Sequence, residues 1–333
     1  SMRAFPKASL YALALCVAMM GGVCAAQPAA DDAAAKFPGR PIRMVVGFTP
    51  GGVPDVTARL IAQKLAESWK QQVVVDNRAG AGGTIAAQIV ANANPDGYTL
   101  LSVSNAHAVA AAVYARLPYD TLKDFAGITM TANGPALLLV SPAIGVKSAR
   151  ELIALAKAKP GQLNYSSAGV GSGTHFGAEL FKSMAGIDVV HVPFKGIPEA
   201  ITETMTGRVQ FFLSPLASAI NLVKEGRVPA IGVTSSKRVS QLPDVPTVAE
   251  SGLPGYRWDF WYGLLAPART PRTIINKLNR EITGILNQPE VRSRWSALGA
   301  EPAPSTPAQF DKFVADEVAA LTKLARAGNI KAE

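Results

Sequence analysis

Short runs of apolar residues alternate along most of the chain with longer stretches in which apolar residues recur every three to four positions. The short runs are typical of buried strands, and the longer spacing is typical of amphipathic helices. The pattern predicts strands at 42–48, 72–77, 98–104, 136–141, 163–167, 188–194, 209–214 and 229–235. It predicts helices at about 54–70, 83–94, 106–115, 148–158, 174–185, 197–206 and 217–225. This alternation predicts an α/β fold with parallel sheets and helices on both faces.

The end of the chain departs from the alternation. After residues 258–268 only helical patterns follow, near 271–287, 289–298 and 306–327. Two long strand-like segments, around 127–141 and 256–267, are natural crossovers between two α/β lobes. We therefore expect a discontinuous lobe 1, residues 37–132 plus 260–333, and a lobe 2 of residues 133–259.

Residues 1–26 have the layout of a secretory signal peptide. Basic Arg3 and Lys7 precede an apolar stretch and then small residues, with cleavage sites after residue 25 or 26. Cleavage at either position removes Cys16 and Cys24, the two cysteines of the chain. The mature protein is then expected to lack disulfides, thiolate metal sites and cysteine nucleophiles.

Composition narrows the class of protein. With 333 residues, 48% of them hydrophobic and 17% charged, the chain is expected to form about two globular domains. The net charge of +9 falls to +7 when Arg3 and Lys7 leave with the signal peptide. The basic residues are dispersed and form no run of five or six like charges, so we expect no binding of nucleic acid.

The turn after the first predicted strand, residues 48–55, is one candidate binding loop. Gly51 and Gly52 would let the backbone approach a ligand, and Pro54 suits a first helical turn, whose free N–H groups would accept an anion. The alternative is that the glycines only form a tight turn and that Asp55 only favours the helix dipole.

A second candidate loop, residues 166–175, contains three glycines, three serines, a threonine and a histidine between a strand and a helix. The loop is not a dinucleotide-binding fingerprint, because Thr174 replaces the last glycine of that motif. It is not a nucleophile elbow either, because Val170 replaces the glycine required two residues before the serine. Ser172 near His175 leaves open a serine hydrolase, although no orienting acid is evident. We expect loss of the Ser172 and Thr174 hydroxyls to weaken ligand binding without changing the stability of the unliganded protein.

The remaining candidates follow strand ends. The histidines are isolated and have no zinc-binding spacing, so we expect no metal, no cofactor and no catalytic residue. His191 lies within a strand and is interpreted as structural, whereas His107 and His175 lie just past strand ends and fit either role. The glycine-rich turn 78–84 is interpreted as mainly structural, with lining of the cleft as the lesser alternative. Phe194 is either core or an aromatic wall.

Five segments closely resemble the periplasmic substrate-binding proteins of tripartite tricarboxylate transporters, the Bug family. They are residues 48–55, 75–83, 166–175, 193–196 and, most specifically, 242–256. The resemblance implies a type II periplasmic-binding-protein fold, in which two α/β lobes joined by two crossing strands close on a ligand. It also implies a periplasmic monomer that delivers a small carboxylate to the membrane permease subunits of a transporter.

The resemblance assigns ligand contacts to two loops. From the first it implies Phe48, Thr49, Pro50, Gly51, Gly52, Val53 and Asp55, and from the second Ser167, Gly171, Ser172, Thr174 and His175. Further pocket walls implied by the match are Ser104, His107, Phe194, Lys195, Gly196 and Trp261.

One departure from the family pattern bears on the ligand. Many relatives have an acidic residue at the end of the strand 209–214, where this chain has Ser214. Without that acid a ligand ammonium would be left unpaired in a closed cleft, so a ligand without an amine, such as a dicarboxylate, is expected. Phe194 and Trp261 would suit a flat ring such as that of terephthalate, while an aliphatic dicarboxylate or a citrate-like tricarboxylate stays open. A sensor that reports to a membrane receptor is the alternative to transport.

Overall fold

The structure is a computed structural model that describes residues 35–332. The predicted signal peptide lies outside the described residues. The strands are β1 (Ile42–Val46), β2 (Val73–Asn77), β3 (Thr99–Ser104), β4 (Phe125–Val140), β5 (Asn164–Ser167), β6 (Val190–Pro193), β7 (Phe211–Pro215), β8 (Ala230–Val233), β9 (Asp259–Pro267) and β10 (Glu301–Pro302). The helices are α2 (Val53–Trp69), α3 (Thr84–Ala91), α4 (Ala106–Val113), α5 (Ala149–Ala158), α6 (Gly173–Ala185), α7 (Ile197–Met205), α8 (Leu216–Lys224), α9 (Val248–Ser251), α10 (Arg272–Leu286), α11 (Pro289–Ala297) and α12 (Pro307–Gly328).

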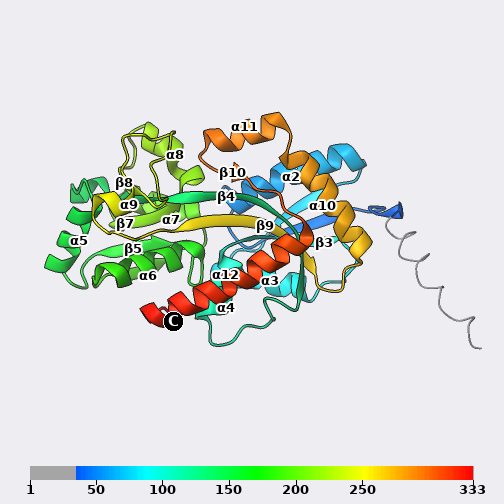
Figure 1. Ribbon diagram of the computed structural model, residues 1–333, viewed down its shortest axis with the longest axis horizontal. Coiled ribbons are helices and arrows are strands. Elements are labelled where there is room, and N and C mark those ends of the chain that lie inside the picture. The colour runs from blue at the N-terminus through cyan, green and yellow to red at the C-terminus, as the bar shows by residue number, and fades with distance from the viewer. Residues whose placement is uncertain (1–34, 333) are drawn as a thin grey trace, which may run out of the picture.

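The strands form two groups that share β4. On one side the order is β2-β1-β3-β9-β4, and on the other it is β4-β7-β5-β6, with β8 also paired to β4. Pairing is parallel among β1, β2 and β3 and among β5, β6 and β7, and it is antiparallel at β4 and β9. We call the half built on β1–β3 lobe 1 and the half built on β5–β8 lobe 2 (Figure 1). The predicted α/β class is confirmed.

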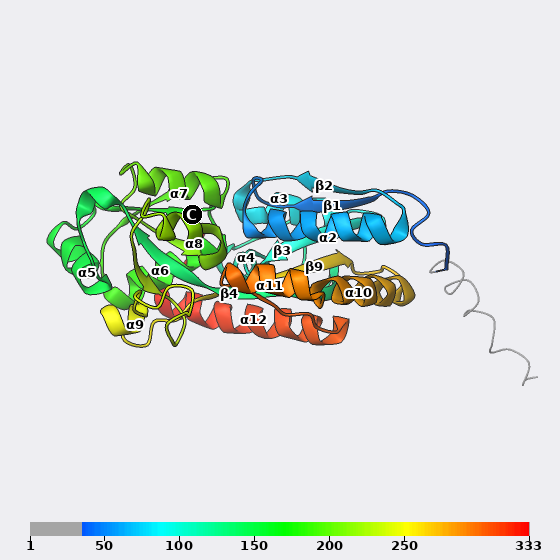
Figure 2. The same ribbon diagram turned by 90° about the horizontal axis from the view of Figure 1, so that it is seen from above.

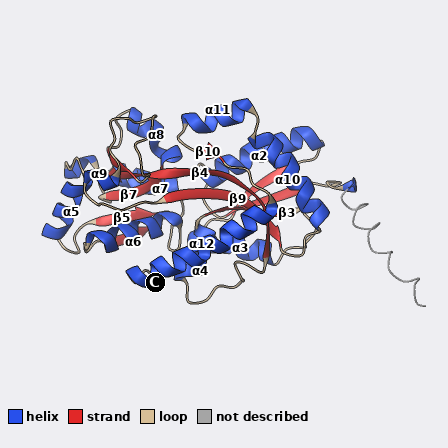
Figure 3. Ribbon diagram, in the orientation of Figure 1, coloured by secondary structure: helices blue, strands red, loops and turns tan. Residues whose placement is uncertain are grey.

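Two long strands connect the lobes. In β4 the residues from Phe125 to Pro135 pair with β9 in lobe 1, whereas those from Ala136 to Val140 pair with β7 and β8 in lobe 2. Just before β9, the Trp258 N–H donates to Thr234 O of lobe 2 at 3.3 Å. Figure 3 shows β4 and β9 running side by side between the lobes. The exact lobe boundaries expected from the sequence stay a prediction.

The helices bury one face against these strands. Ile61 and Leu65 of α2, and Leu278 of α10, are fully buried in one cluster with Met44 of β1. Burying each such side chain stabilises the fold by about 1.5–3 kcal/mol. The long helix α12 runs along β4 and contacts α4 of lobe 1 and α6 of lobe 2 (Figure 2). Within residues 35–332 the structure contains no helix of the length and apolar character needed to cross a membrane.

Two elements lie where the sequence pattern predicts none. The single-turn helix α9 has a capping box, in which the Thr247 hydroxyl accepts from the Glu250 N–H and the Glu250 carboxylate accepts from the Thr247 N–H. It is too short to show a helical period. Strand β10 is two residues long and pairs with β4, so its formation depends on a contact distant in sequence.

Candidate ligand-binding site

A small cavity lies between the two lobes. We call it the interlobe cavity. Its lining residues are Phe48, Pro54, Ser104, Asn105, Phe260 and Tyr262 from lobe 1, and Ala168, Ser172, Gly173, Thr174, Ile197 and Pro215 from lobe 2. A cavity lined by both lobes is a usual place for a small-molecule ligand.

Helix N-termini converge on this cavity. Within the described residues, five helices begin at its lining: α2 beside Pro54, α4 at Asn105, α6 at Ser172, α7 at Ile197 and α8 at Pro215. Their positions follow from the fold, because most of these helices start at the carboxyl end of a parallel strand. The first turn of a helix has N–H groups without intrahelical acceptors and a partial positive charge. The convergence favours an anion.

The interlobe cavity offers this attraction through neutral groups. None of its lining residues within 35–332 is Asp, Glu, Lys or Arg. In Figure 2, α7 and α8 lie on the side of lobe 2 that faces lobe 1. The helix ends of both lobes therefore lie around the same cavity.

Hydroxyl groups add donors at the start of α6. The Ser172 Oγ accepts from the His175 backbone N–H at 3.2 Å, and the Thr174 Oγ1 accepts from the Ala168 N–H at 2.8 Å. The two hydroxyl oxygens are 2.9 Å apart. Because one hydroxyl hydrogen is shared between them, the other remains for a ligand. Ser172 is also the N-cap of α6, which corrects the expectation that these hydroxyls are unimportant for the unliganded fold.

The lobe 1 side presents Ser104, Asn105 and Tyr262. Ser104 and Tyr262 are direct cross-strand neighbours in β3 and β9. Tyr262 is buried, and its hydroxyl has no hydrogen-bond partner among the described residues. Burial raises the pKa of Tyr262, so the hydroxyl keeps its proton and is able to donate.

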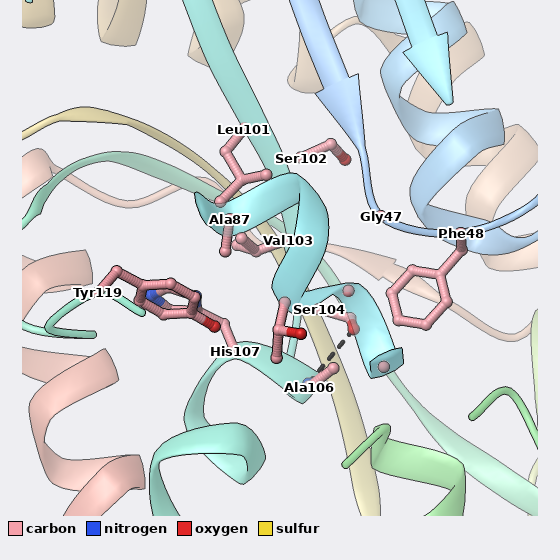
Figure 4. A pocket seen from close by; sticks show the side chains of 13 residues that line it. Gly47, Phe48, Ala87, Leu101, Ser102, Val103, Ser104, Ala106, His107 and Tyr119 are labelled. Carbon is pink, nitrogen blue, oxygen red and sulfur yellow. Dashed lines mark hydrogen bonds between the residues drawn. The ribbon is translucent and has the colours of Figure 1, made fainter. Parts of the chain in front are cut away.

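A second small cavity lies within lobe 1, behind Phe48 and Ser104, which line both cavities. Figure 4 shows His107 beside Tyr119 in this inner cavity, with the Ala106 N–H donating to Ser104 Oγ at 3.3 Å. His107 Nε2 donates to Thr121 O at 3.2 Å. Burial lowers the pKa of His107 to about 4, so its ring is neutral near pH 7. The structure places His107 in this inner cavity.

The first turn contacts lobe 2 more than it lines the interlobe cavity. Thr49 Oγ1 donates to Glu199 Oε2 at 3.0 Å, and a Cβ added to Gly196 would lie 1.8 Å from Thr49 Oγ1. Pro50 and Gly51 are exposed, whereas Gly52 and Val53 are buried. These residues bring the lobes together at the start of α7. Of the first-turn residues implied by the resemblance, Phe48 alone is in the lining.

The carboxylate of Asp55 is engaged within the turn. It accepts from the Gly51 N–H (3.0 Å), from Arg59 Nε (3.0 Å) and from Asn77 Nδ2 (2.9 Å). Burial raises the pKa of Asp55, but these hydrogen bonds outweigh burial and hold the pKa below its usual value. Asp55 therefore braces the loop, and the structure does not bring it into either cavity.

Ser167, Gly171 and His175 lie behind the second loop. Ser167 Oγ is 2.6 Å from His191 Nε2, and His175 Nδ1 accepts from the Gly171 N–H at 3.2 Å. The rings of His175 and His191 stack at 4.2 Å. The Ser172 hydroxyl contacts the backbone of His175 rather than its imidazole, so the pair lacks the geometry of a nucleophile and its base.

The structure corrects the expectation for Trp261. Its Nε1 donates to Glu317 Oε2 at 3.0 Å, and its ring packs against Phe310 and Phe313 of α12. Successive side chains of a strand point to opposite faces, so its neighbours Phe260 and Tyr262 line the cavity instead. Neither Phe260 nor Tyr262 was predicted as a wall residue, although the alternation of side chains along this aromatic strand points to both.

The other predicted wall residues are dispersed. Phe194 is half-buried and packs in the cluster that contains Phe48, while Lys195 is exposed. Ser214 is buried and donates to Pro215 O at 3.1 Å, so Pro215 rather than Ser214 reaches the lining.

The turn interpreted as mainly structural lies at the contact between lobes. A Cβ added to Gly82 would come within 2.3 Å of Val170 O in lobe 2. Gly82 and Gly83 also line the inner cavity. Among residues 35–332, no cluster of His, Cys, Asp or Glu is arranged to hold a metal ion.

Comparison with known proteins identifies relatives of the chain. The family model described as "Tripartite tricarboxylate transporter family receptor" matches residues 57–330. The protein BugT of Bordetella pertussis is 37% identical over 292 residues, which cover 87% of this chain and 90% of BugT.

Two solved structures from Rhodopseudomonas palustris are similar throughout. Rpa4515 with adipate has a TM-score of 0.85 and 35% identity, and the match covers 89% of this chain and 99% of that one. MatC with bound malate has a TM-score of 0.83 and 34% identity, over 86% of this chain and 99% of that one.

Proposed function

The chain belongs to the tripartite tricarboxylate transporter receptor family, whose members are substrate-binding receptors rather than enzymes, and we propose that it captures a dicarboxylate between its lobes for delivery to the membrane subunits of such a transporter. The observation that carries this proposal is the convergence of five helix N-termini on an interlobe cavity whose described lining contains no charged side chain. Such a site stabilises an anion through dipoles and hydroxyl donors.

The ligand is a dicarboxylate without an amine. An ammonium group would lack a carboxylate partner among the described lining residues, and its burial would be costly. Phe48, Phe260 and Tyr262 supply the apolar wall, which accommodates an aliphatic chain or an aromatic ring such as that of terephthalate. The adipate and malate bound to the two Rhodopseudomonas proteins support a dicarboxylate.

Capture proceeds by closure of one lobe on the other. The anion docks on lobe 1, and lobe 2, residues 133–259, then brings the start of α6 to the same ligand. Thr49 and Glu199 join the lobes at 3.0 Å, and Tyr114 Oη donates across the lobes to Val170 O at 3.1 Å. A ligand that contacts both lobes stabilises the closed state because it interacts with that state more strongly than with the open one. The mature receptor acts as a periplasmic monomer after removal of residues 1–26.

A thermal-shift screen tests the function. The panel contains terephthalate, phthalate, adipate, malate, citrate, glutamate and nicotinate. A bound dicarboxylate is expected to raise the melting temperature increasingly with concentration, with about 2.7 kcal/mol of stabilisation at one hundred times its Kd. Stabilisation by glutamate alone would overturn the argument against an amine. If no carboxylate raised the melting temperature, the receptor function itself would be wrong.

A further inference from the structure

Asn105 presents an unused acceptor to the interlobe cavity. The residue is 1% exposed, and its Nδ2 donates to Asp259 O at 3.3 Å. This hydrogen bond fixes the orientation of the carboxamide, because the flipped amide would place Oδ1 against the carbonyl oxygen of Asp259. Oδ1 has no donor among the residues that the structure describes.

In this arrangement of the lobes Gly173 of lobe 2 covers this oxygen, so separation of the lobes would uncover it. Gly173 begins α6 opposite it, and a Cβ at Gly173 would come within 2.1 Å of Asn105 Oδ1. The absence of a side chain at Gly173 therefore makes room for the carboxamide between the lobes. A buried acceptor without a donor destabilises a protein, so such groups are rare unless a ligand or water satisfies them.

The other polar side chains of the cavity present donors. Tyr262 has a hydroxyl without a partner in the described part of the chain, and Ser104 accepts from the Ala106 N–H, which leaves its own hydrogen. The Ser172 and Thr174 pair keeps one hydroxyl hydrogen. Carboxylate oxygens satisfy such donors, but a carboxylate cannot satisfy Asn105 Oδ1, because an ionised carboxylate only accepts.

We propose that Asn105 Oδ1 accepts a hydrogen bond from a hydroxyl group of the ligand, which makes the physiological ligand a hydroxylated carboxylate. This rests on the proposed function and narrows its substrate class. An ammonium donor would need a nearby carboxylate, and the Asp55 carboxylate is held by Gly51, Arg59 and Asn77 outside the lining. A hydroxyl is a neutral donor and does not carry that cost.

Matched pairs of ligands that differ by one hydroxyl test the proposal. Succinate with malate, glutarate with 2-hydroxyglutarate, and tricarballylate with citrate are titrated into the full mature chain by isothermal titration calorimetry. In at least one pair the hydroxylated acid is expected to bind at least about tenfold more tightly. Asn105→Leu, which keeps the approximate shape but lacks the acceptor, should reduce that preference to about twofold or less.

Tyr262→Phe is the matched control. This variant removes a hydroxyl that donates to a carboxylate present in both members of a pair. It should therefore weaken the binding of both acids and leave the ratio of their affinities unchanged. Equal affinity of the two acids for the wild-type protein, or a preference that survives Asn105→Leu, would overturn the role of Asn105 while carboxylate binding stands. If no member of any pair binds while adipate or terephthalate does, the hydroxyl assignment fails and the receptor function stands. If no carboxylate binds at all, both fail.

Discussion

The Thr49 hydroxyl donates a hydrogen bond of 3.0 Å to Glu199, and this bond crosses from lobe 1 to lobe 2. Thr49 belongs to the turn after β1, and Glu199 lies in the first turn of α7, which begins at the interlobe cavity. The contact therefore joins the lobes beside the cavity at which helices of both lobes begin. Its strength adds to the stability of this arrangement of the lobes.

Thr49→Val should weaken ligand binding without affecting the fold of either lobe. A hydrogen bond to a charged group contributes roughly 1.5–3 kcal/mol, so we expect a loss of affinity of about ten- to 150-fold. Calorimetric titration with a dicarboxylate measures it. Thr202→Val is the control, because that hydroxyl bonds to Pro198 O within α7. An equal loss in both variants would contradict the role of the interlobe bond.

Gly196→Ala should block closure directly. Gly196 has an extended backbone with φ −166°, which any residue adopts, but its added Cβ would lie 1.8 Å from Thr49 Oγ1. The melting temperature of the unliganded protein should change little because the open state relieves the clash, while ligand affinity should fall at least about tenfold. Small-angle scattering should show a more open average shape. Gly284→Ala, where nothing lies within 4 Å, should have neither effect.

The order of elements and the positions of the two loops were predictable from the sequence, because hydrophobic period and glycine placement are local signals. Strand β1, for example, follows from one apolar run, and α6 follows from the polar loop that caps it. The side to which a residue points in β9 was not inferred from its aromatic character. Trp261 faces α12, and Phe260 and Tyr262 face the cavity, because the pairing of β9 with β3 and β4 sets the register.

Tertiary contacts, both within a lobe and between lobes, were also beyond local reasoning. Asp55 follows a glycine turn in the pattern of a ligand-binding helix start, yet Arg59 and Asn77 hold its carboxylate. Gly82 was interpreted as structural, and it meets Val170 from the other lobe. Arg59 is one helical turn from Asp55, but Asn77 and Val170 lie far along the chain from their partners, and only the assembled fold brings them together.

Tyr262→Phe should stabilise the unliganded protein or leave it unchanged. The buried Tyr262 hydroxyl has no partner among the described residues, so its removal relieves a desolvation cost of about 1–3 kcal/mol. Urea denaturation of the ligand-free protein measures the change. Tyr256→Phe is the opposite case, because the Tyr256 hydroxyl donates to Gly177 O at 2.8 Å and its loss should destabilise. Destabilisation of similar size in both variants would show that the Tyr262 hydroxyl is satisfied.

Ser172→Ala should reduce both stability and affinity. Loss of the N-cap hydrogen bond to the His175 N–H is expected to destabilise the unliganded protein by about 1 kcal/mol. Ser172→Gly removes the same hydroxyl but costs only a few tenths of a kcal/mol at an N-cap. Comparison of the two by denaturation and by calorimetry therefore separates capping from ligand contact. If Ser172→Gly retained full affinity, the hydroxyl would serve the helix alone.

His107 should make the unliganded protein less stable in mild acid. Burial lowers the pKa of His107 to about 4, against 6.5 for an unperturbed histidine. Between these values the unfolded chain binds a proton that the folded protein does not, so the free energy of unfolding falls as pH falls from 6.5 toward 4. A difference of this size corresponds to roughly 3 kcal/mol. Urea denaturation of wild type and His107→Gln at pH 7, 5.5 and 4.5 measures the contribution. The carboxyl groups titrate in both proteins, so their effect cancels in the difference between the two pH profiles. The variant should lose less stability over this interval, and parallel pH profiles would show that His107 already takes up its proton in the folded state.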